Sequence, residues 1–224
     1  MSKQTRGNLG EEKVISTLTK MKGFFRLINN LTLEKGKGST HQIDHIFINE
    51  KGVFVIESKS LYGEIHGDNK DTVWEKIERK KNVIIHNPII QNNSHVRIIK
   101  SYLGNDIEVI SVVVFTLNNA PYFPNENVIN LNDLPLFLSE YPCKRALNEK
   151  QIDMIYNYLL RKESDASMEE HLDNIKAIKE KRRVIQQDIT YALENRKCPK
   201  CKNKIKESKP NYFICEKCGF HFHL

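Results

Sequence analysis

The sequence lacks any hydrophobic run that approaches the roughly eighteen residues needed to span a membrane. Its first residues, MSKQTRGNLGEEK, contain no apolar segment of the kind found in secretory signal peptides. Internal repeats and low-complexity tracts are also absent. We therefore expect a soluble cytoplasmic protein without a membrane partner, whose 224 residues form one buried core and a smaller accessory module.

Cysteine is scarce, and four of the five cysteines fall within residues 198–224. These are Cys198, Cys201, Cys215 and Cys218, which form two CxxC pairs. This spacing is typical of a metal site, whereas disulfides are rare in cytosolic proteins. Cys143 follows a proline in a loop-like stretch, and we assign it no role in a site.

The positive charge is confined to the C-terminal end of the chain. Residues 176–224 contain 13 lysines and arginines against 5 acidic residues, a net charge of +8, whereas residues 1–175 contain 22 against 23, a net charge of −1. Such asymmetry favours a module that binds a polyanion such as nucleic acid. The alternative is a basic tail that only solubilises the chain.

Hydrophobic periodicity predicts an α/β fold. Helices are expected over about 9–21, 92–104, 148–161 and 165–196, and strands over about 24–33 and 107–115. The segments IDHIFIN and VFVIESK flank a turn at 49–52 and form a β-hairpin, which follows a loop at 36–40. This order predicts a mixed central sheet flanked by helices. We expect a core domain over 1–145, a helical region with a basic linker helix over 146–196, and a cysteine module over 197–224.

A polar cluster lies on the predicted hairpin. With the turn centred on 49–52, paired residue numbers sum to 101, so Asp44 faces Glu57 and Gln42 faces Lys59. Alternation places all four on one face. That face also carries Ile46, Ile48, Val53 and Val55. The other face carries Ile43, His45, Phe47, Phe54 and Ile56, so helices are expected to cover both faces of the sheet.

The two facing carboxylates, Asp44 and Glu57, predict a metal site. Half-buried carboxylates repel each other, and one takes up a proton unless a cation neutralises the pair. Mg²⁺ or Mn²⁺ prefers such oxygen ligands, and Lys59 beside it could polarise a water or steady developing negative charge. The alternative is an ordinary cross-strand ion pair of Lys59 with one of the carboxylates.

These residues resemble a known family. Asp44 followed by Glu57-Ser58-Lys59 resembles the D…ExK signature of restriction-endonuclease-like nucleases, and more closely the nuclease-related (NERD) domain. Further matching pieces follow in family order across about residues 7–115, namely Gly7, Gly10-Glu11, Gln42-Ile43-Asp44-His45, Gly52 to Lys59, Tyr62-Gly63, Trp74, Asn87-Pro88 and Gln91. Ile43 stands where the wider superfamily has a proline.

The resemblance implies a restriction-endonuclease-like core and a set of roles. Asp44 and Glu57 would hold Mg²⁺ or Mn²⁺, Lys59 would assist the attacking water, and Glu11 would reach in from the first helix. Gln42 and Gln91 would be supporting polar groups. For Glu11 the alternative is a solvent-exposed carboxylate favoured by the helix dipole.

The C-terminal cysteines have the spacing of a structural zinc ribbon, whose four thiolates leave no open position for catalysis. The module resembles the zinc ribbons of type I topoisomerases, which bind single-stranded DNA. This implies phosphate contacts from basic residues and base stacking by aromatic ones. The candidates are Lys200, Lys202, Lys204, Lys206 and Lys209, with Tyr212 and Phe213 for stacking. The alternative is a protein-binding or purely structural ribbon.

Together, the hairpin residues, the resemblance and the cysteine module predict a metal-dependent nuclease that acts on nucleic acid. The resemblance favours DNA over RNA. One alternative is a non-catalytic nucleic-acid-binding or scaffold protein that keeps the nuclease fold. Another is a protein that recruits partners through its ribbon.

Overall fold

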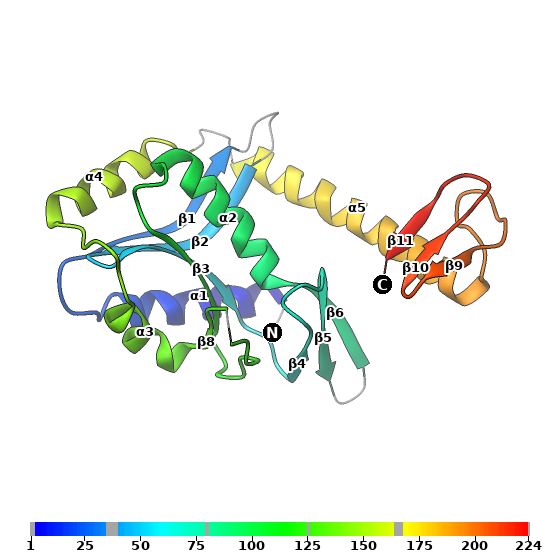
Figure 1. Cartoon of the computed structure of the whole chain (residues 1–224), viewed down its shortest axis with the longest axis horizontal. Helices are drawn as coiled ribbons and strands as arrows, with labels where there is room; N and C mark the ends of the chain where they lie inside the picture. Colours follow the sequence, from blue (N-terminus) through cyan, green and yellow to red (C-terminus); the bar gives the residue numbers. More distant parts are fainter. Residues whose placement is uncertain (1–2, 35–39, 79–80, 125, 164–167, 224) are drawn as a thin grey trace. The chain divides into compact units, whose positions relative to one another are not determined.

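The computed structural model describes residues 3–34, 40–78, 81–124, 126–163 and 168–223 and divides into two compact units, residues 1–164 and 165–224 (Figure 1). The helices of the first unit are α1 (Lys3–Leu18), α2 (Pro88–Leu103), the 3₁₀ turn η1 (Leu131–Asp133), α3 (Leu134–Glu140) and α4 (Glu149–Leu160). Its strands are β1 (Arg26–Glu34), β2 (Thr40–Asn49), β3 (Gly52–Lys59), β4 (Glu64–His66), β5 (Val73–Glu78), β6 (Lys81–His86), β7 (Val109–Phe115) and β8 (Val128–Asn130). The predicted loop at 36–40 lies outside the described residues except for Thr40, where β2 begins.

The central sheet has the strand order β1-β2-β3-β7-β8. Strand β2 is antiparallel to both β1 and β3, whereas β7 runs parallel to β3, and β8 runs parallel to β7. The expected mixed α/β fold is therefore confirmed. The parallel pair places the C-terminal end of β3 beside that of β7 and far from the β2–β3 turn.

The predicted register of the hairpin is confirmed from His45–Ile56 to Asn49–Gly52, where every pair sums to 101. The side chain of Asn49 accepts the backbone N–H of Lys51 at 2.8 Å across the turn. Gly52 has a φ of +143°, and a Cβ there would lie 2.8 Å from the carbonyl oxygen of Glu108. Glycine thus allows the start of β3 to approach the start of β7.

Two hydrophobic layers enclose the central sheet, with α2 and α4 over one face and α1 and α3 over the other (Figure 1). The first layer includes Ile46, Ile48, Val53, Val55, Val96, Ile99, Ile152 and Leu159. The second includes Phe47, Phe54, Ile56, Val112, Val14, Leu18, Leu134 and Leu138. Both faces of the hairpin are therefore covered, as its apolar alternation predicts.

The alternation breaks at one point, which corrects the predicted faces of β2. Ile43 lies in the same layer as Ile46, although residues three apart in a regular strand face opposite sides. On the neighbouring strand, Asn30 has a φ of +57°, a left-handed conformation that asparagine tolerates. Asn30 and Asp44 are the one pair missing from an otherwise continuous β1–β2 register, so the break in alternation lies at this position.

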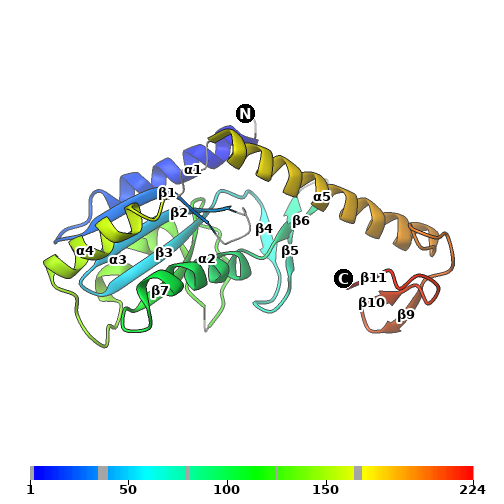
Figure 2. The same ribbon diagram turned by 90° about the horizontal axis from the view of Figure 1, so that it is seen from above.

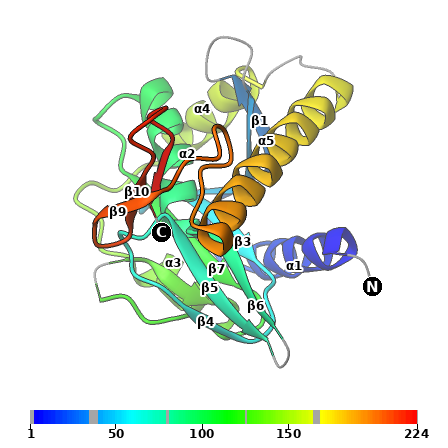
Figure 3. The same ribbon diagram turned by 90° about the vertical axis from the view of Figure 1, so that its right-hand side faces the viewer.

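A second sheet, β4-β5-β6, was not predicted and forms around Trp74 (Figure 3). The indole is 1% exposed, stacks on Phe123 with ring centroids 5.1 Å apart, and donates to the carbonyl of Asp68 at 2.8 Å. A Cβ on Gly67 would lie 2.1 Å from the indole, so only glycine fits there. Hydrophobic periodicity did not predict these strands because they are short and carry many charged residues.

Helix α2 begins at Pro88, four residues before the predicted start at 92. The side chain of Asn87 accepts the N–H of Ile89 at 2.8 Å, and proline fits the first helical position because it needs no donor there. The amide nitrogen of Asn87 also donates to the carbonyl of Asp71 at 2.7 Å. One side chain therefore caps α2 and secures the loop between β4 and β5.

The second unit contains α5 (Met168–Asn195) and the strands β9 (Lys206–Lys209), β10 (Tyr212–Ile214) and β11 (His221–His223), which form one antiparallel sheet (Figure 2). The last turns of α5 pack on this sheet through Ile189, Ala192 and Leu193, which contact Phe213 and Phe222. Among the described helices, none is both long enough and apolar enough to cross a membrane.

Candidate functional site

Glu57 is the centre of a buried hydrogen-bonded group at the C-terminal end of β3. Its side chain is 2% exposed, and its Oε1 atom accepts the ammonium of Lys59 and, at 2.8 Å, the side-chain amide of Gln91. The carbonyl oxygen of that amide accepts a second bond from Lys59 at 3.3 Å. Gln91, from the first turns of α2, therefore holds both charged groups.

The other carboxylate oxygen of Glu57 faces a histidine. Oε2 is buried without a hydrogen-bond partner among the described residues, and Nδ1 of His95 lies 3.6 Å away. The ring of His95 meets the ring of His41 edge to face at 5.8 Å. His95 was not predicted from the sequence, although its position four residues after Gln91 places the two on one helical face.

Asp44 is half-buried and is held by the residue between Glu57 and Lys59. Its Oδ2 atom accepts the backbone N–H of Ser58 at 2.9 Å and the hydroxyl of Ser58 at 3.1 Å. The negative charge of Asp44 raises the pKa of Glu57. The two carboxylates thus act on one another, although the pairing of β2 with β3 ends one residue pair earlier, at His45–Ile56.

Glu11 joins the group from helix α1 because Gly10 lets the helix approach the sheet. A Cβ on Gly10 would lie 2.9 Å from Cβ of Ser60 and 3.3 Å from Oγ1 of Thr116. Burial and then the charge of Asp44 raise the pKa of Glu11, while Lys59 lowers it. Glu11 is partly buried, which does not fit the alternative of a solvent-exposed carboxylate.

Burial dominates the electrostatics of the site. It raises the pKa of Glu57 to about 7, an effect that Lys59 opposes and that Asp44 and Glu11 reinforce. Burial lowers the pKa of Lys59, but the charges of the carboxylates raise it overall, with Glu57 contributing most. The ammonium therefore stays charged, and it is shared among three carboxylates.

Gln42 does not join this group in the way the sequence predicts. Its side chain is exposed, and its amide donates to Oδ1 of Asn30 at 3.0 Å. The pairing of β2 with β3 ends at His45–Ile56, so Gln42 does not pair with Lys59. The pairing ends next to the irregular position at Asn30 and Asp44, which a hairpin register cannot reveal.

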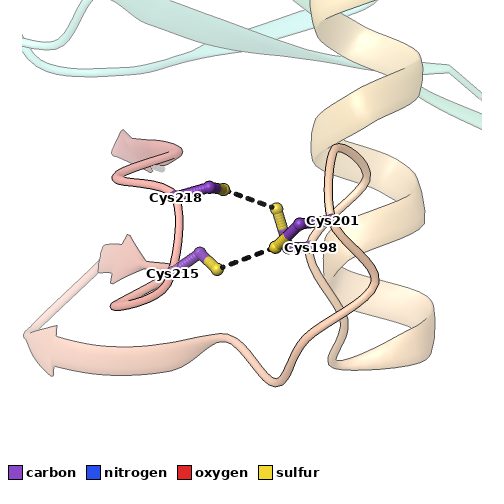
Figure 4. Close-up of side chains that lie close together, drawn as sticks. All are labelled: Cys198, Cys201, Cys215 and Cys218. Atoms are coloured by element: carbon purple, nitrogen blue, oxygen red, sulfur yellow. Dashed lines mark hydrogen bonds between the residues drawn. The ribbon is translucent and has the colours of Figure 1, made fainter.

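The four C-terminal cysteines form the expected cluster (Figure 4). Among the described residues, only these bring three or more potential ligand atoms within 4.8 Å of one another. The Sγ atoms of Cys198 and Cys218 lie 3.5 Å apart, as do those of Cys201 and Cys215. A tetrahedral Zn²⁺ with bonds of about 2.3 Å would separate its sulfurs by about 3.8 Å, so the cluster fits zinc.

The predicted nucleic-acid contacts of the ribbon fall on different sides of it. Phe213 is 6% exposed and stacks on Phe222 at 5.0 Å, so its ring is not available for a base. Lys200 pairs with Asp188 of α5 at 2.8 Å, and Nζ of Lys202 lies 4.1 Å from the ring centroid of Tyr191. Lys204 is exposed near the start of the ribbon, where its backbone forms an isolated antiparallel β-bridge with that of Lys197.

The outer face of the ribbon sheet carries the remaining candidates. Alternation places Tyr212 opposite Phe213, and the register brings Lys209 and Lys206 to that same outer face. The ring of Tyr212 lies 5.8 Å from that of His221. Lys206 also pairs with the exposed Glu216 at 2.8 Å.

Comparisons with known proteins agree with this arrangement. Residues 6–116 match the family profile of the nuclease-related domain, NERD, a span that contains every residue of the group around Glu57. An uncharacterized protein of Bacillus anthracis is 31% identical over 163 residues, which cover 70% of this chain and 76% of that protein. A search of the solved structures found no match.

Proposed function

Because the chain belongs to the nuclease-related (NERD) domain family, we propose that it is a metal-dependent nuclease that hydrolyses phosphodiester bonds, with DNA as its favoured substrate. The observation that carries the proposal is the buried ion pair of Glu57 with Lys59, on which the charges of two further carboxylates, Asp44 and Glu11, act. When all four groups are ionised, three negative charges and one positive charge leave a net −2. One divalent cation balances that charge.

The residues present fit such an ion. Oε2 of Glu57 is a buried oxygen that lacks a hydrogen-bond partner among the described residues, and a bound cation would satisfy it. Ser58 occupies Oδ2 of Asp44, so Oδ1 would face the same ion. Asp44 and Glu57 would hold Mg²⁺ or Mn²⁺, whose remaining positions water and substrate phosphate would fill. The bound ion would lower the pKa of a water and draw charge from the phosphate.

The surrounding side chains supply the other parts of the reaction. Lys59 would donate to the phosphate as negative charge develops on it. Gln91 keeps that ammonium beside Glu57 by bonding both. Glu11, whose pKa is raised by burial, is the group best suited to accept a proton from the attacking water.

We further propose that the ribbon binds zinc through its four cysteines and holds nucleic acid on its outer face. Single strands suit this face, because Lys209 can contact phosphate while Tyr212 and His221 offer rings for stacking. Phe213 is withdrawn from this role because it is buried. Lys200 and Lys202 become secondary candidates because they already contact α5.

A cleavage assay tests the proposal. The purified chain is incubated with linear, circular and single-stranded DNA and with RNA, in Mg²⁺, Mn²⁺ or EDTA. We expect metal-dependent cleavage that Asp44→Ala and Lys59→Ala reduce at least about a hundredfold, because each removes a group needed in the transition state. Glu11→Gln should reduce cleavage as well, whereas the matched change at its exposed neighbour, Glu12→Gln, should not. Intact substrates under every condition would refute the enzyme, and binding without cleavage would favour the non-catalytic alternative.

A further inference from the structure

A cavity of about 530 Å³ lies at the other end of the central sheet from Glu57. Its floor includes Gly52, the first residue of β3, whereas Lys59 ends that strand. Seven residues of extended chain separate these two positions by about 23 Å. The cavity is therefore a different place from the candidate catalytic site.

Backbone hydrogen bonds fix the walls of this cavity. The N–H of Leu147 donates to the carbonyl of Glu50 at 2.8 Å, which anchors the segment between α3 and α4 to the hairpin turn. The N–H of Val53 donates to the carbonyl of Glu108 at 2.9 Å, which anchors the opposite wall. The cavity is thus formed before any ligand enters it, as is usual for small-molecule sites.

Three cations line the cavity on two walls and outnumber its two carboxylates, those of Asp106 and Glu108. Lys100 comes from the last turn of α2, and Lys144 and Arg145 come from the segment between α3 and α4. Within the part of the chain that the structure describes, none of the three has a carboxylate within 4.0 Å. Their donors are available to an anion, and the planar guanidinium suits phosphate.

The interior offers hydrogen-bond groups and an aromatic ring. Tyr141, which lines the cavity, packs edge-on against Phe54 with centroids 5.3 Å apart. Burial and then the charge of Glu108 raise the pKa of Tyr141, so its hydroxyl keeps its proton and can donate. The carboxylate of Glu108 offers acceptor oxygens, and Asn127 is held in place by donating to the carbonyl of Ser111 at 2.9 Å.

We propose that this cavity binds a ligand of mononucleotide size and chemistry. Lys100, Lys144 and Arg145 would bind the phosphate, and Glu108 with Tyr141 would bind the sugar hydroxyls and the base. A volume of about 530 Å³ is in the usual range for small-molecule sites and larger than a phosphate ion needs. The assignment goes beyond the proposed nuclease function, because it uses none of the residues around Glu57.

Calorimetric titration of the full-length chain tests this inference. The four 5′-ribonucleoside monophosphates and inorganic phosphate are titrated separately, without added divalent metal. We expect at least one nucleotide to bind at least about tenfold more tightly than phosphate. The double variant Lys144→Ala/Arg145→Ala should weaken that binding at least about tenfold, since it removes two charge-assisted contacts. The control Lys150→Ala removes an exposed lysine that does not line the cavity and should change nothing.

The variant Asp44→Ala separates this inference from the nuclease proposal. It should bind the nucleotide as wild type does, even if it cleaves nothing. Binding lost in Asp44→Ala but kept in the double variant would place the nucleotide at the catalytic site and overturn the inference. It would also be overturned if no nucleotide bound, or if phosphate bound as tightly as every nucleotide. Thermal unfolding of each variant confirms that the exposed substitutions leave the fold intact.

Discussion

Nδ1 of His95 lies 3.6 Å from Oε2 of Glu57, and the two side chains are 6% and 2% exposed. The histidine faces the carboxylate oxygen that Lys59 and Gln91 do not contact. Helix α2 therefore supplies a neighbour to each carboxylate oxygen, Gln91 beside Oε1 and His95 beside Oε2. We therefore predict that His95 helps to position Glu57.

Replacing His95 by alanine should weaken Mn²⁺ binding about tenfold, because supporting partners of metal ligands commonly contribute that much to affinity. Calorimetry on the zinc-loaded protein measures it. His66→Ala removes an exposed histidine on β4 and is the control. Equal Mn²⁺ affinity in His95→Ala and wild type would show that Glu57 needs no such support.

Gly10→Ala should destabilise the first unit by about 1–3 kcal/mol, the usual cost of overpacking. The added methyl would meet Cβ of Ser60 at 2.9 Å and push α1, with Glu11, away from the sheet. Urea unfolding followed by the fluorescence of Trp74, the single tryptophan, measures the loss. Adding Ser60→Gly should restore much of the stability, and a double variant no more stable than Gly10→Ala would contradict the contact.

Two buried groups should oppose each other in the pH dependence of stability. Burial raises the pKa of Glu57 from 4.5 to about 7, so the free energy of unfolding falls as pH rises through that window. Burial lowers the pKa of His45 from 6.5 to about 4, against the effect of Asp44, so the free energy of unfolding rises between those values. Glu11, whose pKa is also raised by burial, adds to the fall, so in wild type we expect only a shallow decline above pH 4.5.

Replacing either group should reveal the pH dependence of stability that the other contributes. Glu57→Gln should gain on the order of 3 kcal/mol of stability as pH rises from 4 to 6.5, since each pKa unit corresponds to about 1.4 kcal/mol. His45→Gln should lose stability as pH rises from 4.5 to 7. Urea unfolding of metal-free protein, followed by Trp74 fluorescence, measures both profiles. Parallel profiles for the two variants would refute the opposed titrations.

The zinc content should depend on the four clustered cysteines and not on Cys143. We expect one zinc ion per chain in wild type and in Cys143→Ser, and none in Cys198→Ser. A chelator should unfold β9 to β11, because metal binding supplies the folding free energy of such small modules. Trp74 fluorescence should stay unchanged, since Trp74 belongs to the first unit. Elemental analysis and circular dichroism measure these effects, and a ribbon that stays folded without metal would contradict them.

Local patterns predicted much of the fold. The turn at 49–52 and the alternation of β2 and β3 were sufficient to predict the register, because both depend on residues close in sequence. The small sheet around Trp74 was missed because its strands, such as Glu64–His66, are too short for periodicity to reveal. The domain boundaries at 145 and 196 and the catalytic roles stay predictions.

The sequence alone determined the pairing direction of the hairpin that carries Asp44 and Glu57 and the spacing of the four cysteines, since each follows from short-range geometry. Only the tertiary structure decided which further residues join them. It brought Glu11 and His95 to Glu57 through helices packed on opposite faces of the sheet, turned Gln42 outward, and buried Phe213. These outcomes depend on how segments distant in sequence pack together, and no local pattern records that.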